Sequence, residues 1–298
     1  MIMRSFYSSV SHFFVSIILG CGILIASASG ETNVDYSSPE NILRFAEHLY
    51  EQRDYLRAAG EYKRYLFYSP QDADGTLYRI GICYRRAGDT EKAISTFRKV
   101  TTEHTDSSFR FPASYQIAYS YFISERYKSS IQYLDQVVGD AKDPNERGKF
   151  ATLAAYSYLH QRQWHKAEQA LASRTFADEN LNRITSSLRA SAQEGMNLPR
   201  KSPILAGLLS AVVPGTGKIY CKQYGDGLYS LILIGVTGLL AWDGFRDDGL
   251  RSVSGWILGS ISGIFYTGNV YGSSVAARVY NRQLEIDLLR RLPIVPDK

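Results

Sequence analysis

Few residues in this chain have the types and spacing that catalysis or ligand binding requires. The strongest candidate is Gly217-Lys218, because a glycine followed by a lysine occurs in loops that bind nucleotide phosphates. Such a loop also needs a glycine where Val212 stands and a hydroxyl side chain where Ile219 stands. Since this chain has neither, the sequence does not predict phosphate binding here.

The histidines and cysteines do not form a recognisable site either. Four histidines fall outside any metal-binding pattern: His48, His104, His160 and His165. The last two are five residues apart around a predicted helix turn, and we expect both to be solvated. Cys83 and Cys221 fall in different predicted domains without ligand-like neighbours, so we expect small buried side chains and no disulfide. We predict that the protein is not an enzyme and binds neither a metal nor a cofactor.

Composition excludes several other classes of protein. The chain has 298 residues, of which 45% are hydrophobic and 21% charged, and its net charge is +5. It is too apolar and too rich in tyrosine to be disordered, and three cysteines are too few for a disulfide scaffold. No long block of like charge is present, so we expect no nucleic-acid partner.

One motif recurs four times in the middle of the chain. Its small residues at positions 58, 93, 130 and 167 are 35, 37 and 37 residues apart. Each unit also has a small residue on its first predicted helix, namely Ala46, Gly81, Ala118 or Ala155. Three residues later each has a large one, namely Leu49, Tyr84, Tyr121 or Tyr158. A small residue lets the second helix approach closely while the large one fills the groove beside it. The pattern resembles the tetratricopeptide repeat.

This resemblance implies an all-α solenoid of about four repeats over residues 38–196. Its last apolar face needs a cap, and residues 178–196 supply a helix with Leu181, Ile184 and Leu188 on one side. A solenoid of this kind presents a concave surface that binds a protein or peptide segment. We name Tyr78, Tyr115 and Tyr119 as candidates for that surface, with burial in the repeat core as the alternative.

The N-terminal residues 1–30 have the pattern of a secretory signal peptide. Arg4 precedes an apolar run over residues 13–28 that ends in small residues before Glu31. An uncleaved anchor is the alternative. Lipidation at Cys21 is a second one, although the apolar run continues beyond that cysteine.

Beyond the predicted linker at residues 197–203, the composition changes to that of a membrane domain, residues 204–279. Uncharged stretches run over residues 202–217, 227–242 and 252–277. We expect two or three transmembrane or re-entrant helices, with three apolar segments preferred and a buried soluble hairpin as the alternative. In the third stretch Gly255, Gly259 and Gly263 recur every four residues, which favours close helix packing in lipid.

A motif within this domain carries a second resemblance. It comprises Pro214, Gly215, Gly217 and Tyr220, followed by Gly225 and Gly227 and, much later, by Asn269. It resembles the Pro-Gly-x-Gly-x-x-Tyr signature of a family of small bacterial membrane domains. Lys218 departs from the polar amide usual in that family. The resemblance supports a membrane topology and implies no chemistry, and we expect Asn269 to form a hydrogen bond between helices.

Charge then suggests an orientation. Three segments with an outside solenoid would place these basic residues inside: Lys218, Lys222, Arg278, Arg282, Arg290 and Arg291. The same topology places the acidic turn of Asp243, Asp247 and Asp248 outside. We expect residues 280–298 to form an amphipathic basic tail that rests on the membrane surface or on the helical bundle.

The resulting hypothesis is a scaffold in the bacterial inner membrane. It would present a periplasmic tetratricopeptide solenoid to a protein or peptide of the cell envelope, with membrane lipid as its other partner. A small transport or insertion component regulated by its repeats is the first alternative. A solenoid lipoprotein resembling outer-membrane assembly factors is the second.

Overall fold

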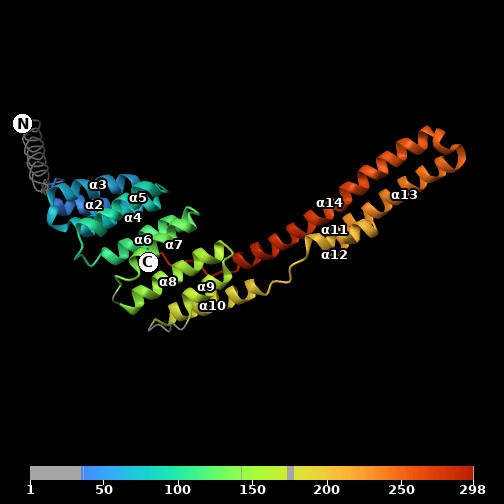
Figure 1. The fold of residues 1–298 in the computed structure, drawn as a ribbon. Coiled ribbons are helices and arrows are strands. Elements are labelled where there is room, and N and C mark those ends of the chain that lie inside the picture. The colour runs from blue at the N-terminus through green and yellow to red at the C-terminus, as the bar shows by residue number, and fades with distance from the viewer. Residues whose placement is uncertain (1–34, 36, 142, 173–177, 298) are drawn as a thin grey trace, which may run out of the picture. The chain divides into compact units, whose positions relative to one another are not determined.

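The computed structural model describes residues 35, 37–141, 143–172 and 178–297. Within these ranges the regular structure is entirely helical, which confirms the predicted all-α class (Figure 1). The predicted signal segment and Cys21 lie outside the described residues. The chain forms two compact units, divided after Gly88, and each is described by itself.

The first unit contains three helices that pack in sequence order. They are α2 (Pro39–Glu51), α3 (Tyr55–Tyr68) and α4 (Ala73–Arg86), with a short 3-10 turn at Pro70–Asp72. Helix α3 packs against both of its neighbours. Ser38 caps α2 by accepting a hydrogen bond from the Asn41 backbone N–H, and Asp54 caps α3 in the same way from Arg57.

The second unit begins with six helices of the solenoid. They are α5 (Thr90–Glu103), α6 (Arg110–Ile123), α7 (Tyr127–Val137), α8 (Pro144–His160), α9 (Trp164–Leu171) and α10 (Glu179–Met196). Each packs against the next along the chain. Helix α10 is the predicted cap, because Leu181, Ile184 and Leu188 are buried along one side of it.

The turns inside the four predicted repeats share one backbone geometry. Arg53, Gly88, Glu125 and Arg162 have left-handed φ values of 64°, 82°, 60° and 59°. Each stands five residues before the small residue at 58, 93, 130 or 167. Three of the four are not glycine, so the left-handed conformation is held at a cost that the packed helices offset. The same turn four times at the same register supports four homologous units.

The burial of the small residues confirms the predicted helix packing. Positions 58, 93, 130 and 167 are each 0% exposed, as are Ala46, Ala118 and Ala155. A side chain larger than a methyl or hydroxymethyl group would push the paired helices apart at these sites. The large partners are more varied, since Leu49 and Tyr84 are buried while Tyr121 and Tyr158 are half-buried.

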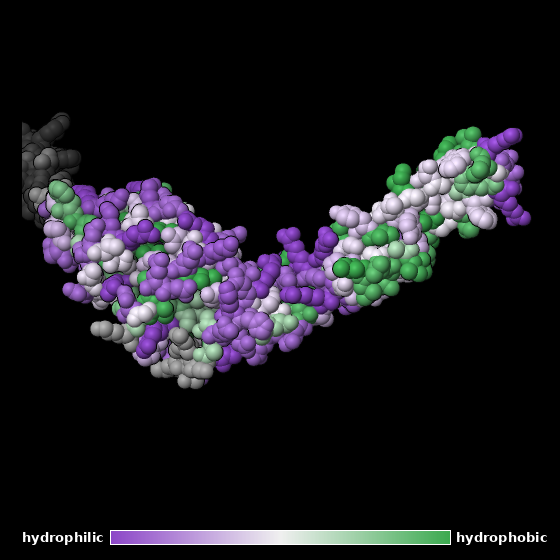
Figure 2. Space-filling model, viewed as in Figure 1, coloured by the Kyte–Doolittle hydropathy of each residue, from purple (hydrophilic) through white to green (hydrophobic). Residues whose placement is uncertain are grey.

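The membrane-domain candidate consists of four helices. They are α11 (Pro203–Val212), α12 (Thr216–Tyr220), α13 (Tyr224–Asp248) and α14 (Val253–Arg290). Helices α13 and α14 form an antiparallel hairpin, and α11 and α12 lie against its base (Figure 1). Figure 2 shows that apolar surface gathers on these helices, whereas the turn between α13 and α14 is hydrophilic.

Length and composition make one of these helices a candidate membrane span. Among the described residues, only the segment 224–251 is long and apolar enough to cross a bilayer by these criteria, and 17% of its apolar window is buried. Helix α11 has 10 residues. It therefore reaches about 15 Å, half of a hydrocarbon core of about 30 Å. The first segment therefore does not cross as one straight helix, because it ends at Val213 and Pro214, and the number of spanning segments stays a prediction.

Glycines of the Pro-Gly-x-Gly-x-x-Tyr motif bring three helix backbones into contact. A Cβ at Gly217 would lie 1.9 Å from the carbonyl oxygen of Ala206 on α11. A Cβ at Gly215, whose φ is +87°, would lie 2.0 Å from the carbonyl oxygen of Gly227 on α13. The Ser210 hydroxyl on α11 also contacts this glycine, because it accepts a hydrogen bond from the Gly217 backbone N–H at 2.9 Å. These contacts explain why the motif needs glycine at 215, 217 and 227.

The glycine ridge on α14 is shorter than predicted. Gly255 lies against the ring of Phe245, and Gly259 is in ordinary contact with Phe245 and Ala241 on α13. Gly263 has nothing within 4 Å of its Cβ position and is exposed, so it takes no part in this packing.

Helix α14 continues far beyond the predicted membrane domain. It has 38 residues without interruption and is therefore about 57 Å long. Its last turns lie on the solenoid, where Leu288 is 1% exposed within the same core as Leu153, Leu159 and Leu188. The prediction that residues 280–298 rest on the membrane or the bundle was wrong, because this apolar face packs onto α8 to α10.

The predicted linker is tied to α14 along its length. The side-chain amide of Asn281 donates to the Lys201 carbonyl at 2.8 Å, and its carbonyl accepts the Lys201 backbone N–H at 2.7 Å. Ser274 donates to the Pro203 carbonyl at 2.9 Å. The segment therefore forms a fixed junction within the second unit.

We predict that Gly217→Ala destabilises the helical hairpin by about 3 kcal/mol, at the upper end of the usual cost of overpacking. The physical reason is that its methyl group would meet the Ala206 backbone, which cannot rotate away. Thermal unfolding of the full chain in detergent measures the change. Gly263→Ala is the matched control, because its methyl group would enter open space. Equal stability of the two variants would contradict the close approach.

Candidate peptide-binding site

The candidate site is a groove in the second unit that holds the chain's own C-terminal segment. Residues 292–297 follow the end of α14 as a non-helical segment and lie against α6 and α8. Three side chains of the solenoid hold this segment through hydrogen bonds to its backbone. We call residues 292–297 the tail.

All three of these side chains donate to backbone carbonyls of the tail. The Tyr156 hydroxyl on α8 donates to the carbonyl of Pro293 at 3.0 Å. The Tyr115 hydroxyl on α6 donates to Pro296 at 2.5 Å, and the Gln116 side-chain amide donates to Asp297 at 2.7 Å. A protein that binds an extended peptide commonly does so through such main-chain contacts.

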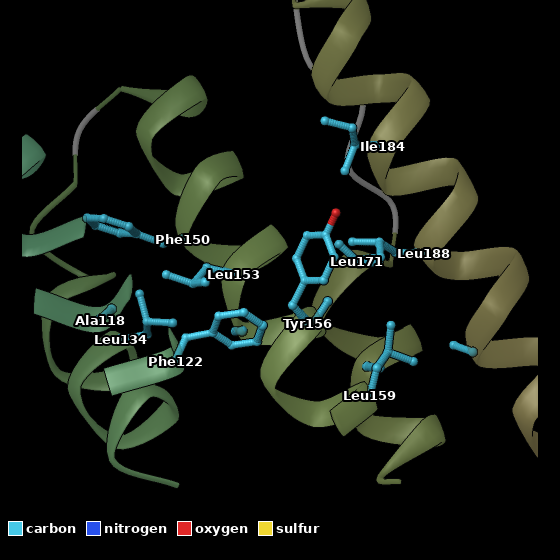
Figure 3. Close-up of a cluster of buried hydrophobic side chains, with 14 of the residues drawn as sticks. Ala118, Phe122, Leu134, Phe150, Leu153, Tyr156, Leu159, Leu171, Ile184 and Leu188 are labelled. Atoms are coloured by element: carbon cyan, nitrogen blue, oxygen red, sulfur yellow. The ribbon is translucent and has the colours of Figure 1, made fainter. Parts of the chain in front are cut away.

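The donors Tyr115 and Tyr156 belong to the buried core of the solenoid. Tyr156 is 1% exposed and its ring lies among Phe122, Leu159 and Leu188 (Figure 3). Burial raises the pKa of the Tyr156 phenol above its ordinary value of 10.0, so its hydroxyl keeps its proton and remains a donor. The ring of Tyr115 stacks on that of Tyr119, with centroids 6.1 Å apart.

Ion pairs fix the end of α14 beside the groove. Glu285 accepts from Arg162 at 2.7 Å and pairs with Arg200 at 3.3 Å, and its side chain is only 15% exposed. Arg162 belongs to the left-handed turn of the fourth repeat, and Arg200 to the linker. Arg291 donates to Glu194 on α10 at 2.5 Å. These contacts all precede the tail.

A cavity of about 740 Å³ lies between the tail and α10. It is lined by Tyr119, Asn180, Arg183, Ile184, Ser187 and by residues 293–297. This volume falls within the range of ordinary ligand pockets. The site therefore has unfilled space next to the segment that already occupies it.

The three tyrosines that the sequence singled out lie in different places. Tyr115 is 6% exposed and contacts the tail, and the half-buried Tyr119 lines the cavity. Tyr78 is half-buried on α4 in the first unit, which does not contain this groove. Its role in protein binding stays a prediction. Gln116 and Tyr156 were not predicted as site residues, because nothing in a single sequence shows that their side chains bind the C-terminal segment.

The structure changes one expectation about the histidines. His165 is exposed as expected, but His160 is half-buried and its ring stacks on Tyr127 at 4.9 Å. Burial, helped by the positive charge of Arg162, lowers the pKa of His160 below 6.5. His160 therefore packs as a neutral aromatic ring beside the core, and the prediction of a solvated side chain was wrong.

The two described cysteines are buried, and the described ranges hold no cluster of metal-binding side chains. Cys83 is 0% exposed, and burial raises the pKa of its thiol to about 12. Cys221 is 2% exposed, so both are buried small side chains as expected. Within the described ranges no group of three or more His, Cys, Asp or Glu residues could hold a metal ion.

Polar residues are also buried inside the helical hairpin. Asn269 is 4% exposed, and both polar atoms of its amide are without a hydrogen-bond partner. The expected bond from Asn269 to another helix is therefore not made. Ser210 and Ser273 form the bond between α11 and α14 instead, at 2.6 Å, and Lys218 donates to Ser230 on α13 at 2.9 Å.

Comparison with known proteins identifies the repeats only. Residues 43–108 match the family model of the tetratricopeptide repeat. No curated protein matches the chain. The Pro-Gly-x-Gly-x-x-Tyr resemblance therefore stays a prediction. The matched residues cover α2 to α5, and repeats of this family form surfaces for protein–protein interaction.

Proposed function

We propose that this protein is a membrane-anchored scaffold whose tetratricopeptide solenoid binds a segment of a partner protein in the bacterial envelope. The observation that carries the proposal is the groove of Tyr115, Gln116 and Tyr156, which already binds an extended segment through its backbone. A surface that binds a polypeptide backbone in this way is suited to a protein partner.

The exposed apolar hairpin supports the anchoring part of the proposal. Large apolar side chains are exposed along both helices, including Leu228, Ile232, Leu239, Trp242, Ile257 and Ile264. A patch of this extent is typical of contact with lipid or with another protein. Helix α13 has 25 residues and so is about 37 Å long, which is enough for one crossing. We propose that α13 and α14 cross together, with α11 and α12 re-entrant at their base.

Aromatic and basic residues at the base of the hairpin support a membrane surface there. The Lys201 ammonium group lies 4.4 Å from the centre of the Tyr220 ring and 5.9 Å from that of Tyr280. Lys222 lies 5.8 Å from the same Tyr280 ring. Amphipathic aromatic rings and lysines favour the headgroup region, so anionic lipid is the second partner that we propose.

The orientation that we propose places the solenoid in the periplasm, and the N-terminal signal pattern supports it. The distribution of basic residues supported this orientation for three spanning segments, but it does not support it for a two-helix hairpin. A hairpin returns both of its ends to one side, so Lys218, Lys222, Arg278 and Arg282 lie on the side of the solenoid. Basic residues favour the cytoplasm. A cytoplasmic solenoid is therefore the alternative that this charge distribution favours, while an N-terminal signal can export a long domain regardless of charge.

Single cysteines test the anchoring and the orientation together. We predict that Lys99→Cys in the solenoid reacts with an impermeant maleimide in intact cells with a permeabilised outer membrane. Asp248→Cys at the hairpin tip should react only after the inner membrane is opened. Cys83 and Cys221 are buried, so the unmodified chain is the control for background. The reverse pattern would place the solenoid in the cytoplasm. Reaction of both cysteines in intact cells would contradict a crossing hairpin.

Site-specific photo-crosslinking tests the scaffold function. A photoreactive residue at Tyr119, which lines the cavity, should form adducts with a partner protein at masses above that of the chain alone. The same group at Tyr158, which lies in a different hollow on α8, is the matched control. The same adducts at both positions, or none at Tyr119, would contradict a partner site in this groove.

One observation favours a second candidate function. Asn269 is a buried polar residue of the apolar hairpin, and the half-buried Lys218 on α12 donates to Ser230 of the hairpin. Buried polar residues in membrane segments often mark a transport path. Reconstituted full chain that passes no ion or solute would exclude this transport component. The lipoprotein alternative concerns Cys21, and mass spectrometry of the mature N-terminus decides between a lipidated and a free start.

A further inference from the structure

We propose that the groove is a receptor for an extended, proline-containing apolar segment of a partner protein, and that the tail is a resident ligand which this partner must displace. This proposal rests on the scaffold function. It adds the class of ligand that the groove binds and the segment that competes with this ligand. Four features of the groove carry it.

The groove recognises its occupant mainly through backbone acceptors. Tyr156, Tyr115 and Gln116 donate to the carbonyls of Pro293, Pro296 and Asp297. Every polypeptide has such carbonyls, so the three donors do not require the tail's own side chains. Any extended segment that brings carbonyls to the same positions can replace it.

Proline suits this groove for a physical reason. It has no backbone N–H, so a proline laid against apolar side chains leaves no buried donor without a partner. The tail has proline at 293 and 296, the positions whose carbonyls accept the two tyrosine hydroxyls. Its restricted φ also lowers the entropy lost when an extended segment binds. A partner segment with a similar proline spacing gains the same advantage.

The tail leaves one buried group of the groove unsatisfied. The side-chain carbonyl oxygen of Gln116 is buried and has no hydrogen-bond partner, although the amide nitrogen of the same residue donates to Asp297. A buried acceptor without a partner costs about 1–3 kcal/mol. A ligand that offers an N–H at this point removes that cost, so a segment other than the tail can bind more tightly.

The tail also fills the groove incompletely. Ile294 is 90% exposed, although it lies beside the 740 Å³ cavity that Tyr119 and Ile184 line. A partner with larger apolar side chains at this point would bury both that cavity and its own surface. Only Leu292 and Val295 of the tail pack against the core.

The tail can leave without disturbing the helix that carries it. Leu288, Glu285 and Arg291, which hold the end of α14, all precede residue 292. The tail is thus a short tethered segment, and tethering gives it an effective concentration of about a millimolar. The apparent affinity for a partner is the intrinsic affinity multiplied by the fraction of molecules in which the tail has left the groove.

Peptide binding tests the proposal directly. The probe is a fluorescent peptide with the sequence of residues 291–298, and anisotropy measures its binding to the purified full chain and to a chain that ends at Arg291. We expect the shortened chain to bind the peptide at least roughly tenfold more tightly than the full chain. Tyr156→Phe in the shortened chain should weaken binding roughly 2- to 10-fold, since one hydrogen bond is lost. Tyr158→Phe is the matched control and should leave binding unchanged.

A second variant keeps the test independent of folding. In it residues 292–298 are replaced by glycine and serine at the same length, which releases the groove without shortening the chain. Equal binding by the full and altered chains, or no binding by either altered chain once its helicity is shown to be intact, would overturn the proposal. A full chain that is dimeric and becomes monomeric on removal of the tail would show exchange of tails between copies and would also overturn it.

This result is separable from the scaffold function. If crosslinks form at Tyr119 but the peptide does not bind the shortened chain, the partner uses the cavity without competing with the tail. If the peptide binds but no crosslink to another protein forms, the groove serves only its own tail.

Discussion

The structure of the second unit depends on the burial of the end of α14 in the solenoid. Leu288 lies in the core with Leu159 and Leu188, and Glu285 is held between Arg162 and Arg200. Burying a leucine side chain contributes about 2 kcal/mol, and a carboxylate shared by two arginines is stronger than an isolated surface pair. Because α14 is one uninterrupted helix, this contact fixes the solenoid of the second unit to the hairpin. The same contact places the tail beside the groove.

Much of the solenoid could be predicted because residues close together in the sequence determine how each helix pair packs. Small residues at 58, 93, 130 and 167 recur at nearly constant spacing, and a helix pair has few ways to bury them. The left-handed residues of the turns were not predicted, since Arg53, Glu125 and Arg162 carry no signal for that conformation. The conformation follows from the geometry of the paired helices. The capping helix followed from one apolar face with no later repeat to cover it.

The candidate site was predicted only in part, because it depends on contacts between distant segments. Tyr115 donates to a residue 181 positions away, and no local pattern encodes such a pairing. The amphipathic pattern of Leu284, Leu288 and Leu292 indicated an apolar face correctly but did not show whether lipid or protein covers it. For the first apolar segment the sequence left both a spanning and a re-entrant helix open. In the structure Pro214 and the close contacts of Gly215 and Gly217 turn the chain back at its middle.

Amide hydrogen exchange tests the continuity of α14 between the hairpin and the solenoid. In the full chain held in detergent or a lipid nanodisc, we predict slow exchange without a break from residue 270 to residue 290, comparable with the buried helix α8. Leu288→Ala should accelerate exchange at residues 282–290 and leave the hairpin at residues 230–262 unchanged. Rapid exchange over residues 278–284 in the unmodified chain would contradict this continuity, because it would mean that the hairpin and the groove are not joined by a rigid helix.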